Sequence, residues 1–142
     1  MHYNGGYLIG QINKLTNRRV NELLKKENIE EFNGAQGLIL FVLMDKETLT
    51  IKEIGKATGL AKTSLTSMLD RMEKKGLIQM KQDEKDRRCT LVCLSEKAKT
   101  YREVIEKVSQ TINEEYYRGM KNSEISYFED TLERITQNLI DQ

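Results

Sequence analysis

The sequence predicts a mainly α-helical fold with one small β-hairpin. Apolar residues recur at three- and four-residue spacing through most of the 142 residues, which is the spacing of one helix face. Proline, which interrupts helices, does not occur in the chain. Only residues 77–94 break the helical pattern clearly, because two short apolar runs flank a charged segment there, as in a hairpin.

The first third of the chain predicts two helices. The first, at residues 7–27, carries Leu8, Ile12 and Leu15 on its apolar side. The second, at residues 34–45, contains the run 38–43, which is apolar on nearly every side. A helix tolerates such a run only when it is deeply buried. A β-strand is the alternative for this run, although its length and the helices that follow favour a helix.

The centre of the chain predicts two short helices joined by a sharp turn. Thr50 and Glu53 form the T-x-x-E pattern of a capping box, in which each side chain satisfies a backbone N–H at the helix start. Gly59 then lies where this helix must end and the chain must turn. The next helix spans residues 62–75 and ends at Gly76. Its expected buried stripe is Leu65, Met68, Leu69 and Met72.

The outer face of this second helix carries small polar and basic side chains. They are Lys62, Thr63, Ser64, Thr66, Ser67 and Arg71. In helix-turn-helix proteins the second helix enters the DNA major groove. Hydroxyls there can bond bases or phosphates, and basic side chains neutralise phosphate charge. The same pattern is also typical of an ordinary solvated amphipathic helix, so this helix by itself leaves both interpretations open.

The hairpin that follows favours DNA binding. Its apolar runs lie at residues 77–80 and 91–94, and its tip contains Asp86, Arg87 and Arg88. An arginine on a protruding tip can enter the narrow, electronegative minor groove. Asp86 can hold an arginine in place through a charge-assisted bond. A merely solvated turn is the alternative interpretation.

Residues 50–98 resemble the winged-helix core of the MarR (multiple antibiotic resistance regulator) family. The likeness rests on LTIKEIGKATGLAKTSLTSMLDRMEKKGLI, followed by DEKDRRCTLVCLSEKAK. Within the second stretch, the tip Asp86-Arg87-Arg88 and residues 91–95 match the family's wing and the start of its next helix. The resemblance implies a dimeric transcriptional regulator whose recognition helix is residues 62–75 and whose wing arginine is Arg88, with Arg87 beside it.

Two positions depart from the family pattern. Ala61 replaces a frequent capping serine, so the recognition helix is expected to be less well capped. Ser67 stands where many members carry an arginine, which puts one base or phosphate contact in doubt. The expected organisation is an N-terminal dimerisation helix and linker at residues 1–33, a winged helix-turn-helix lobe at 34–94, and C-terminal dimerisation helices at 95–142.

The C-terminal third predicts two helices with a narrow apolar seam. Ser95 is a suitable cap for the first, which runs on to residue 116, and a break follows at residues 119–123. Strict three- and four-residue alternation is typical of helix-on-helix packing, either within one chain or with the N-terminal helix of a second subunit. A dimer is favoured because each winged helix covers one half-site, so two must be held ~34 Å apart. The candidate dimerisation residues are Leu8, Ile12, Leu15, Ile125, Phe128, Leu132, Ile135 and Leu139.

Charge is distributed unevenly along the chain. The formal net charge is only +1, but residues 50–90 contain ten Lys or Arg against six Asp or Glu. The local excess is therefore +4, whereas the remainder of the chain carries −3. Because phosphate neutralisation depends on local charge, the centre of the chain is the part suited to DNA.

No enzyme, cofactor or metal site is expected. The one histidine, His2, lies near the N-terminus, and Cys89 and Cys93 are too few for a zinc site. On an extended strand these cysteines would lie ~13 Å apart, too far for a direct disulfide, although redox sensing is an alternative. Cys93 is expected to face the core as a small strand residue. Neither a signal peptide nor a membrane span is recognisable, so the expected location is cytoplasmic.

The sequence therefore predicts a sequence-specific regulator of transcription that binds double-stranded DNA. It is expected to be a repressor that binds pseudo-palindromic operators as a homodimer. The resemblance also implies control by a small-molecule effector, bound where the DNA-reading lobe meets the dimerisation helices. The alternative is a winged-helix protein–protein interaction module, but such a docking face should carry exposed aromatic or aliphatic anchors.

Overall fold

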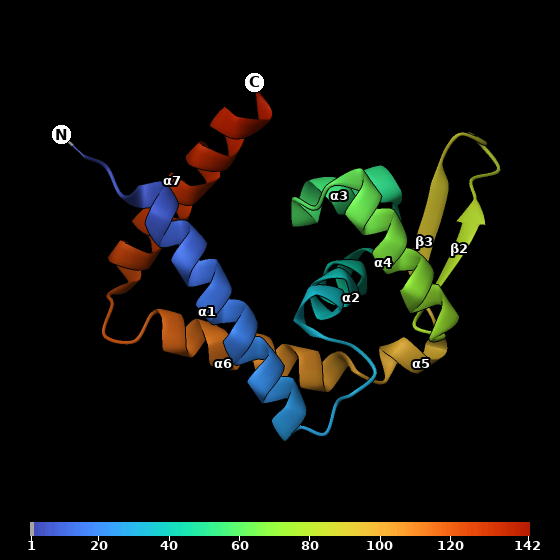
Figure 1. Cartoon of the computed structure of the whole chain (residues 1–142), viewed down its shortest axis with the longest axis horizontal. Coiled ribbons are helices and arrows are strands. Elements are labelled where there is room, and N and C mark those ends of the chain that lie inside the picture. Colours follow the sequence, from blue (N-terminus) through green and yellow to red (C-terminus); the bar gives the residue numbers. More distant parts are fainter. Residues whose placement is uncertain (1) are drawn as a thin grey trace. The chain divides into compact units, whose positions relative to one another are not determined.

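The computed structural model describes residues 2–142 and confirms a mainly helical fold with a small antiparallel sheet (Figure 1). Met1, the first residue of the expected segment 1–33, lies outside the described part. The chain forms two compact units, Met1–Ser109 and Gln110–Gln142. The functional boundaries expected after residues 33 and 94 stay a prediction. None of the helices within residues 2–142 has the length and apolar character that crossing a bilayer requires.

The first unit contains a three-stranded antiparallel sheet surrounded by helices. Strand β3 is central, with β1 and β2 on either side of it. In chain order the elements are α1 (Gly5–Lys26), α2 (Gly34–Lys46), β1 (Thr48–Thr50), α3 (Ile51–Thr58), α4 (Lys62–Lys74), β2 (Ile78–Gln82), β3 (Thr90–Leu94) and α5 (Glu96–Lys99). Helix α6 (Arg102–Tyr116) begins in this unit, and α7 (Asn122–Ile140) belongs to the second.

Strand β1 was not expected from the sequence. It has three residues, too few to show an alternating pattern, and it exists because it pairs with β3. Leu49 lies opposite Val92 in this pairing, and both side chains are buried. The expected hairpin of β2 and β3 is present, with Met80 also opposite Val92.

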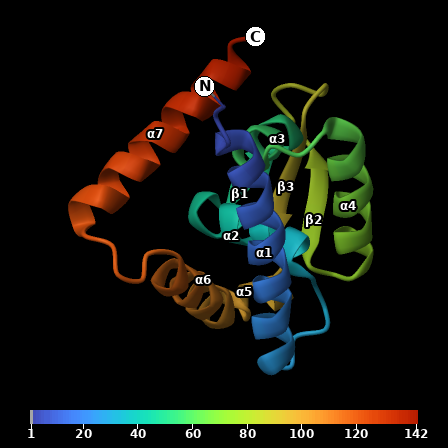
Figure 2. The ribbon, with the colours of Figure 1, turned by 60° about the vertical axis from the view of Figure 1, so that its left-hand side comes forward.

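The core of the first unit lies between the sheet and helices α2, α3 and α4. Leu65, Leu69 and Met72 of α4 are at most 1% exposed, as the predicted stripe requires. Met68, the fourth residue of that stripe, is only half-buried. Ile54 of α3 and Ile78 of β2 are equally buried. Figure 2 shows α4 lying alongside β2, so its apolar stripe packs inward and its polar face points outward.

Helix α2 confirms the helical prediction for residues 38–43 but not their complete burial. Ile39, Leu40 and Leu43 are fully buried, whereas Leu38 and Phe41 are 43% and 41% exposed. The two exposed residues are three positions apart and therefore share one face of the helix. One side of this run consequently stays at the surface, so the expectation of burial on nearly every side is wrong.

The expected capping pattern around the helix-turn-helix is confirmed. Thr50 Oγ1 accepts a hydrogen bond from the Glu53 N–H at 3.1 Å, and Glu53 Oε1 accepts one from the Thr50 N–H at 3.0 Å. Gly59 ends α3 with φ of 72°, a left-handed conformation that glycine adopts without a steric penalty. Ala61, at the N-cap of α4, provides no side-chain bond, as its methyl group dictates.

The helix expected to run unbroken from Ser95 to Tyr116 is interrupted. Ser95 is the cap, since its Oγ accepts from the Ala98 N–H at 3.0 Å. Helix α5 then ends at Lys99, because Thr100 donates both its N–H and its hydroxyl to the Lys97 carbonyl, at 3.2 and 2.6 Å. Such side-chain bonds compete with the helical ladder. The apolar spacing continues across the turn, so periodicity alone could not reveal it.

The second unit contains the end of α6 and all of α7. Gly119 has φ of 81°, which confirms the expected break between the two helices. The Tyr117 hydroxyl donates to Glu129 Oε1 at 2.7 Å, and the Tyr117 ring meets Phe128 edge-on. Burial, followed by the bond to Glu129, raises the pKa of Tyr117 to about 12. This contact therefore joins the two helices within the unit.

The uncapped start of α4 generates a stability prediction. Ala61 already has the extended backbone of an N-cap, with φ of −66° and ψ of 146°. Ala61→Ser is therefore expected to raise the free energy of unfolding by about 1 kcal/mol, because the new hydroxyl can accept a hydrogen bond from a free backbone N–H at the start of α4. Urea unfolding followed by circular dichroism measures the change.

Ala57→Ser is the matched control, because it makes the same exchange at an exposed position inside α3. It should lower the free energy of unfolding by roughly 0.5 kcal/mol, since serine is a weaker helix former than alanine. Equal effects at both positions would contradict the capping explanation.

Candidate nucleic-acid interface

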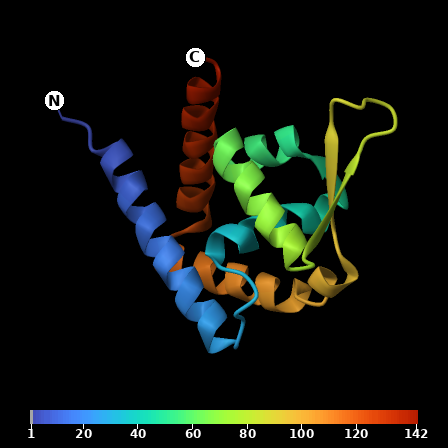
Figure 3. The same cartoon turned by 45° about the vertical axis from the view of Figure 1, so that its right-hand side comes forward.

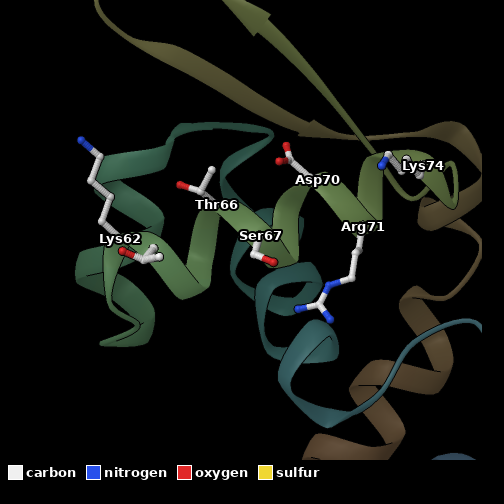
Figure 4. A pocket seen from close by; sticks show the side chains of 7 residues that line it. Lys62, Thr66, Ser67, Asp70, Arg71 and Lys74 are labelled. Carbon is white, nitrogen blue, oxygen red and sulfur yellow. The ribbon is translucent and has the colours of Figure 1, made fainter.

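The outer face of α4 is an open polar groove. All six side chains predicted to bind DNA from this helix are exposed, namely Lys62, Thr63, Ser64, Thr66, Ser67 and Arg71. The groove has a volume of about 570 Å³ and is shown in Figure 4. Its lining consists of Lys62, Thr63, Thr66, Ser67, Asp70, Arg71 and Lys74. Five of the six predicted residues line it, and Ser64 lies outside it.

Sequence reasoning missed two lining residues, Asp70 and Lys74. Both follow Thr66 at steps of four residues, so they continue one row along the helix surface. That spacing could have found them. The prediction selected hydroxyl and basic side chains, so it passed over the acidic Asp70, and it ended at Arg71, three residues before Lys74.

Several hydrogen bonds hold the C-terminal end of α4 against the rest of the first unit. Glu73 Oε2 accepts from the Met80 N–H of β2 at 2.9 Å. Lys75 Nζ, just after the helix, donates to the Glu31 carbonyl at 3.3 Å. The Ser95 hydroxyl donates to the Gly76 carbonyl at 2.6 Å. The helix is thereby fixed relative to the sheet, which determines where its outer face points.

The wing between β2 and β3 protrudes beyond the body of the first unit (Figure 3). Asp86 accepts three bonds from Arg88, from its backbone N–H at 3.1 Å, Nε at 3.1 Å and Nη2 at 3.4 Å. The Arg88 side chain is nevertheless 91% exposed. Arg87 is also exposed, and its carbonyl accepts from Gln82 Nε2 at 2.6 Å. The expected Asp86–arginine bond is therefore present, and DNA contact by these residues stays a prediction.

The pKa of the Asp86 carboxyl lies below its ordinary value of 3.8. The main cause is the hydrogen bond from the Arg88 side chain, followed by that from the Arg88 backbone. Both favour the ionised form of the acid. The bond is consequently complete at neutral pH and is lost as the pH falls below about 3.8 and the carboxylate takes up a proton.

The two cysteines are both free thiols. Cys89 Sγ donates to Asp86 Oδ2 at 3.6 Å, and burial followed by the Asp86 charge raises the pKa of this thiol. A raised pKa reduces the thiolate fraction and with it the reactivity. Cys93 alternates with Val92 and Leu94, whose side chains are buried, so the expectation that Cys93 faces the core is wrong. Within residues 2–142, no three His, Cys, Asp or Glu side chains are placed to hold a metal ion.

Comparison with known proteins identifies this arrangement. Residues 32–90, which include the groove of α4 and the wing, match the model of the MarR family. This region, 59 of the 142 residues, is where the chain is similar to the MarR family. The resemblance drawn from residues 50–98 is thereby confirmed.

Individual relatives extend the likeness beyond the region that the family model matches. The organic hydroperoxide resistance transcriptional regulator of Bacillus subtilis (strain 168) is 45% identical over 74 residues. That match spans 52% of this chain and 48% of the relative, about half the length of each. The HTH-type transcriptional regulator SarZ of Staphylococcus epidermidis is 26% identical over 142 residues, which cover 97% of this chain and 95% of the relative.

Solved structures of transcription regulators share the fold over nearly the whole chain. A MarR mutant from E. coli complexed with operator DNA has a TM-score of 0.74 and 25% identity, and covers 92% of this chain and 91% of its own. A SlyA-like transcription regulator from Listeria monocytogenes has a TM-score of 0.82 at 20% identity, with 94% of this chain and 87% of its own covered. The second likeness concerns the fold alone.

The geometry of the wing generates a pH prediction. Arg88→Ala removes the main cause of the lowered Asp86 pKa, so the pKa of this carboxyl should rise towards 3.8. A pH titration of the side-chain carboxyl signal by NMR measures the change. Arg87→Ala removes a neighbouring charge without removing the bond, so Asp86 should titrate almost as in the wild type. A wild-type-like titration in Arg88→Ala would contradict the observed pairing.

Proposed function

We propose that this protein is a MarR-family transcriptional regulator that binds double-stranded DNA in a sequence-specific manner. The observation that carries the proposal is the pairing of two surfaces in one unit, the exposed polar groove of α4 and the protruding wing with Arg88 at its tip. A helix of this kind enters the major groove, and an arginine on a wing can enter the neighbouring minor groove. The names of the relatives agree with such a role.

The proposed assembly is a homodimer on a pseudo-palindromic operator. Helix α1 exposes a group of large apolar side chains, and α7 has no buried residue at all. Large exposed apolar patches mark interaction sites. A second copy is the partner that fits, because one winged helix reads one half-site and two are needed for an operator. The exposed side chains are Tyr7, Leu8, Ile9, Ile12 and Leu15 on α1 and Tyr127, Ile135, Leu139 and Ile140 on α7.

The finer aspects of the role follow from this assembly. A compact dimer bound to a promoter blocks RNA polymerase without any additional protein, so repression is the proposed mode of action. The protein acts in this proposal by binding rather than by catalysis, in the cytoplasm where its DNA target lies. Control by a small-molecule effector is part of the proposal on the family resemblance, since differential binding to two states would shift DNA affinity.

A protein–protein interaction module is the rival from a different class. It would need exposed aromatic or aliphatic anchors on the recognition helix. The groove of α4 contains hydroxyl and charged side chains only, and its apolar residues Leu65, Leu69 and Met72 are buried. Binding that weakens steeply with added salt supports the DNA hypothesis, whereas salt-independent capture of a partner protein supports the rival.

Two arginine substitutions test the DNA-binding proposal. Arg71→Ala should weaken binding to all duplexes and flatten the dependence on salt, because one phosphate contact is lost. Arg88→Ala should weaken operator binding by about 1–3 kcal/mol, the size of one lost groove contact. Fluorescence anisotropy with a labelled duplex, measured over a range of salt concentrations, gives both quantities.

Lys26→Ala is the matched control for these substitutions. It removes one exposed positive charge from the end of α1, outside the groove and the wing. It should leave both affinity and salt dependence almost unchanged. If Arg71→Ala and Arg88→Ala also left binding unchanged, the contact assignment would be wrong.

Removal of α7 tests the proposed dimer. A chain that ends before Asn122 should sediment as a monomer and lose specific DNA binding, because half-sites can no longer be read together. Leu139→Glu should also shift the monomer–dimer equilibrium towards the monomer, while α7 is retained. Asn138→Glu is the control, because it adds the same charge at the neighbouring polar residue. Sedimentation velocity measures the mass. An unchanged dimer in both the truncated chain and Leu139→Glu would exclude α7 from the interface.

A further inference from the structure

The groove of α4 contains one acidic residue among its seven lining residues. Asp70 lies between Thr66 and Lys74, one turn from each, and its neighbours in the lining are otherwise basic or hydroxyl side chains. In Figure 4 the Asp70 carboxylate stands out from the helix on the same side as Thr66. An acid in this position is unexpected on a surface that must approach DNA phosphates, because like charges repel.

No structural role accounts for the Asp70 carboxylate. The side chain is exposed, and within residues 2–142 it takes part in no hydrogen bond or ion pair, even with Lys74 four residues on. Glu73, the next acid along the helix, does have a structural partner in the Met80 N–H. Asp70 is thus left free to meet a ligand in the groove.

The chemistry of a carboxylate restricts what it can contact in the major groove. Ionised aspartate only accepts hydrogen bonds, so it needs a donor. The donors on base edges in this groove are the amino groups of cytosine and adenine, whereas guanine and thymine offer acceptors. On adenine the acceptor N7 lies beside the amino group and repels the second carboxylate oxygen. Cytosine N4 is therefore the base atom that suits an aspartate best.

We propose that Asp70 is a specificity-determining residue of this interface, which accepts a hydrogen bond from cytosine N4 and disfavours duplexes that lack an amino group at that position. The inference rests on the proposed DNA-binding function. This role explains why an acid lies in the groove. A carboxylate that repels base edges without a donor weakens binding to wrong sequences, and this raises specificity as effectively as a stronger contact with the correct sequence. Asp70 thereby offsets the attraction that Lys62, Arg71 and Lys74 exert on any duplex.

Selection from a randomised duplex library tests this role and identifies the operator in the same experiment. The full-length wild type, Asp70→Ala and Asp70→Asn are each used to select duplexes, and the base preferences are compared. The wild type should prefer cytosine at one position of each half-site. Asp70→Ala should reduce that preference by about 5- to 140-fold, which corresponds to one lost base contact. Asp70→Asn should move it towards adenine, because an amide pairs with adenine N6 and N7.

Asp45→Asn is the matched control. It removes the same charge from an exposed position on α2, outside the groove, and should leave every base preference unchanged. Circular dichroism of each variant verifies folding, which is expected because Asp70 is exposed and has no partner to lose within residues 2–142.

The outcomes separate this inference from the proposed function. A wild type that selects no sequence overturns the proposed function and the inference with it. A wild type that selects an operator while both Asp70 variants keep its preferences overturns the inference alone. Tighter binding of both variants to all duplexes, by the same factor and with unchanged preferences, also overturns it, because Asp70 would then act only as a charge.

Discussion

The burial of one apolar stripe of α4 is the constraint on which the interface depends. Leu65, Leu69 and Met72 lie against α3 and the sheet, and each contributes about 1.5–3 kcal/mol through the apolar surface it removes from water. Because a helix turns every 3.6 residues, anchoring this stripe also determines which side chains face outward. The polar groove is therefore a geometric consequence of the core. Hydrogen bonds at Glu73 and Gly76 then hold the helix end in place.

The wing obtains its order from polar contacts rather than from burial. Asp86 bonds Arg88 three times, yet the arginine side chain remains almost fully exposed. An exposed ion pair contributes little to the free energy of unfolding, so the main effect of this one is to position the Arg88 side chain. An arginine already held in one geometry loses less conformational entropy when it binds. Cys89 belongs to the same cluster, and its raised pKa follows from burial and from lying beside Asp86.

The two ends of the chain contrast with this compact centre. Leu23 and Leu24 at the end of α1 are buried, while the apolar residues of its first half are exposed. In the second unit, the contact between Tyr117 and Glu129 joins α6 to α7 and leaves the apolar seam of α7 without buried residues. Exposed apolar residues at regular helical spacing are better explained by a second copy of the chain than by solvent. Specific DNA recognition and dimer formation are then parts of one proposal.

Much of the central unit could be predicted because its signals are local. The capping box at Thr50, the glycine stop at Gly59, the buried stripe of α4 and the Asp86–Arg88 bond each depend on residues a few positions apart. The same locality explains why five of the six predicted residues of α4 line the groove. Asp70 and Lys74 follow the same helical spacing, so a local signal for them was present as well.

The sequence by itself therefore determined the helices, the hairpin, their caps and the polarity of each helix face, because these depend on neighbouring residues. Only the tertiary structure decided the pairing of β1 with β3 and the exposed side of α2 at Leu38 and Phe41. Whether Cys93 faces the core was likewise decided by the register of β3 in the sheet. The strand pairing, its register and the exposed side of α2 depend on contacts between residues far apart in the chain. A local sequence pattern does not determine which distant segment a short strand or helix will contact.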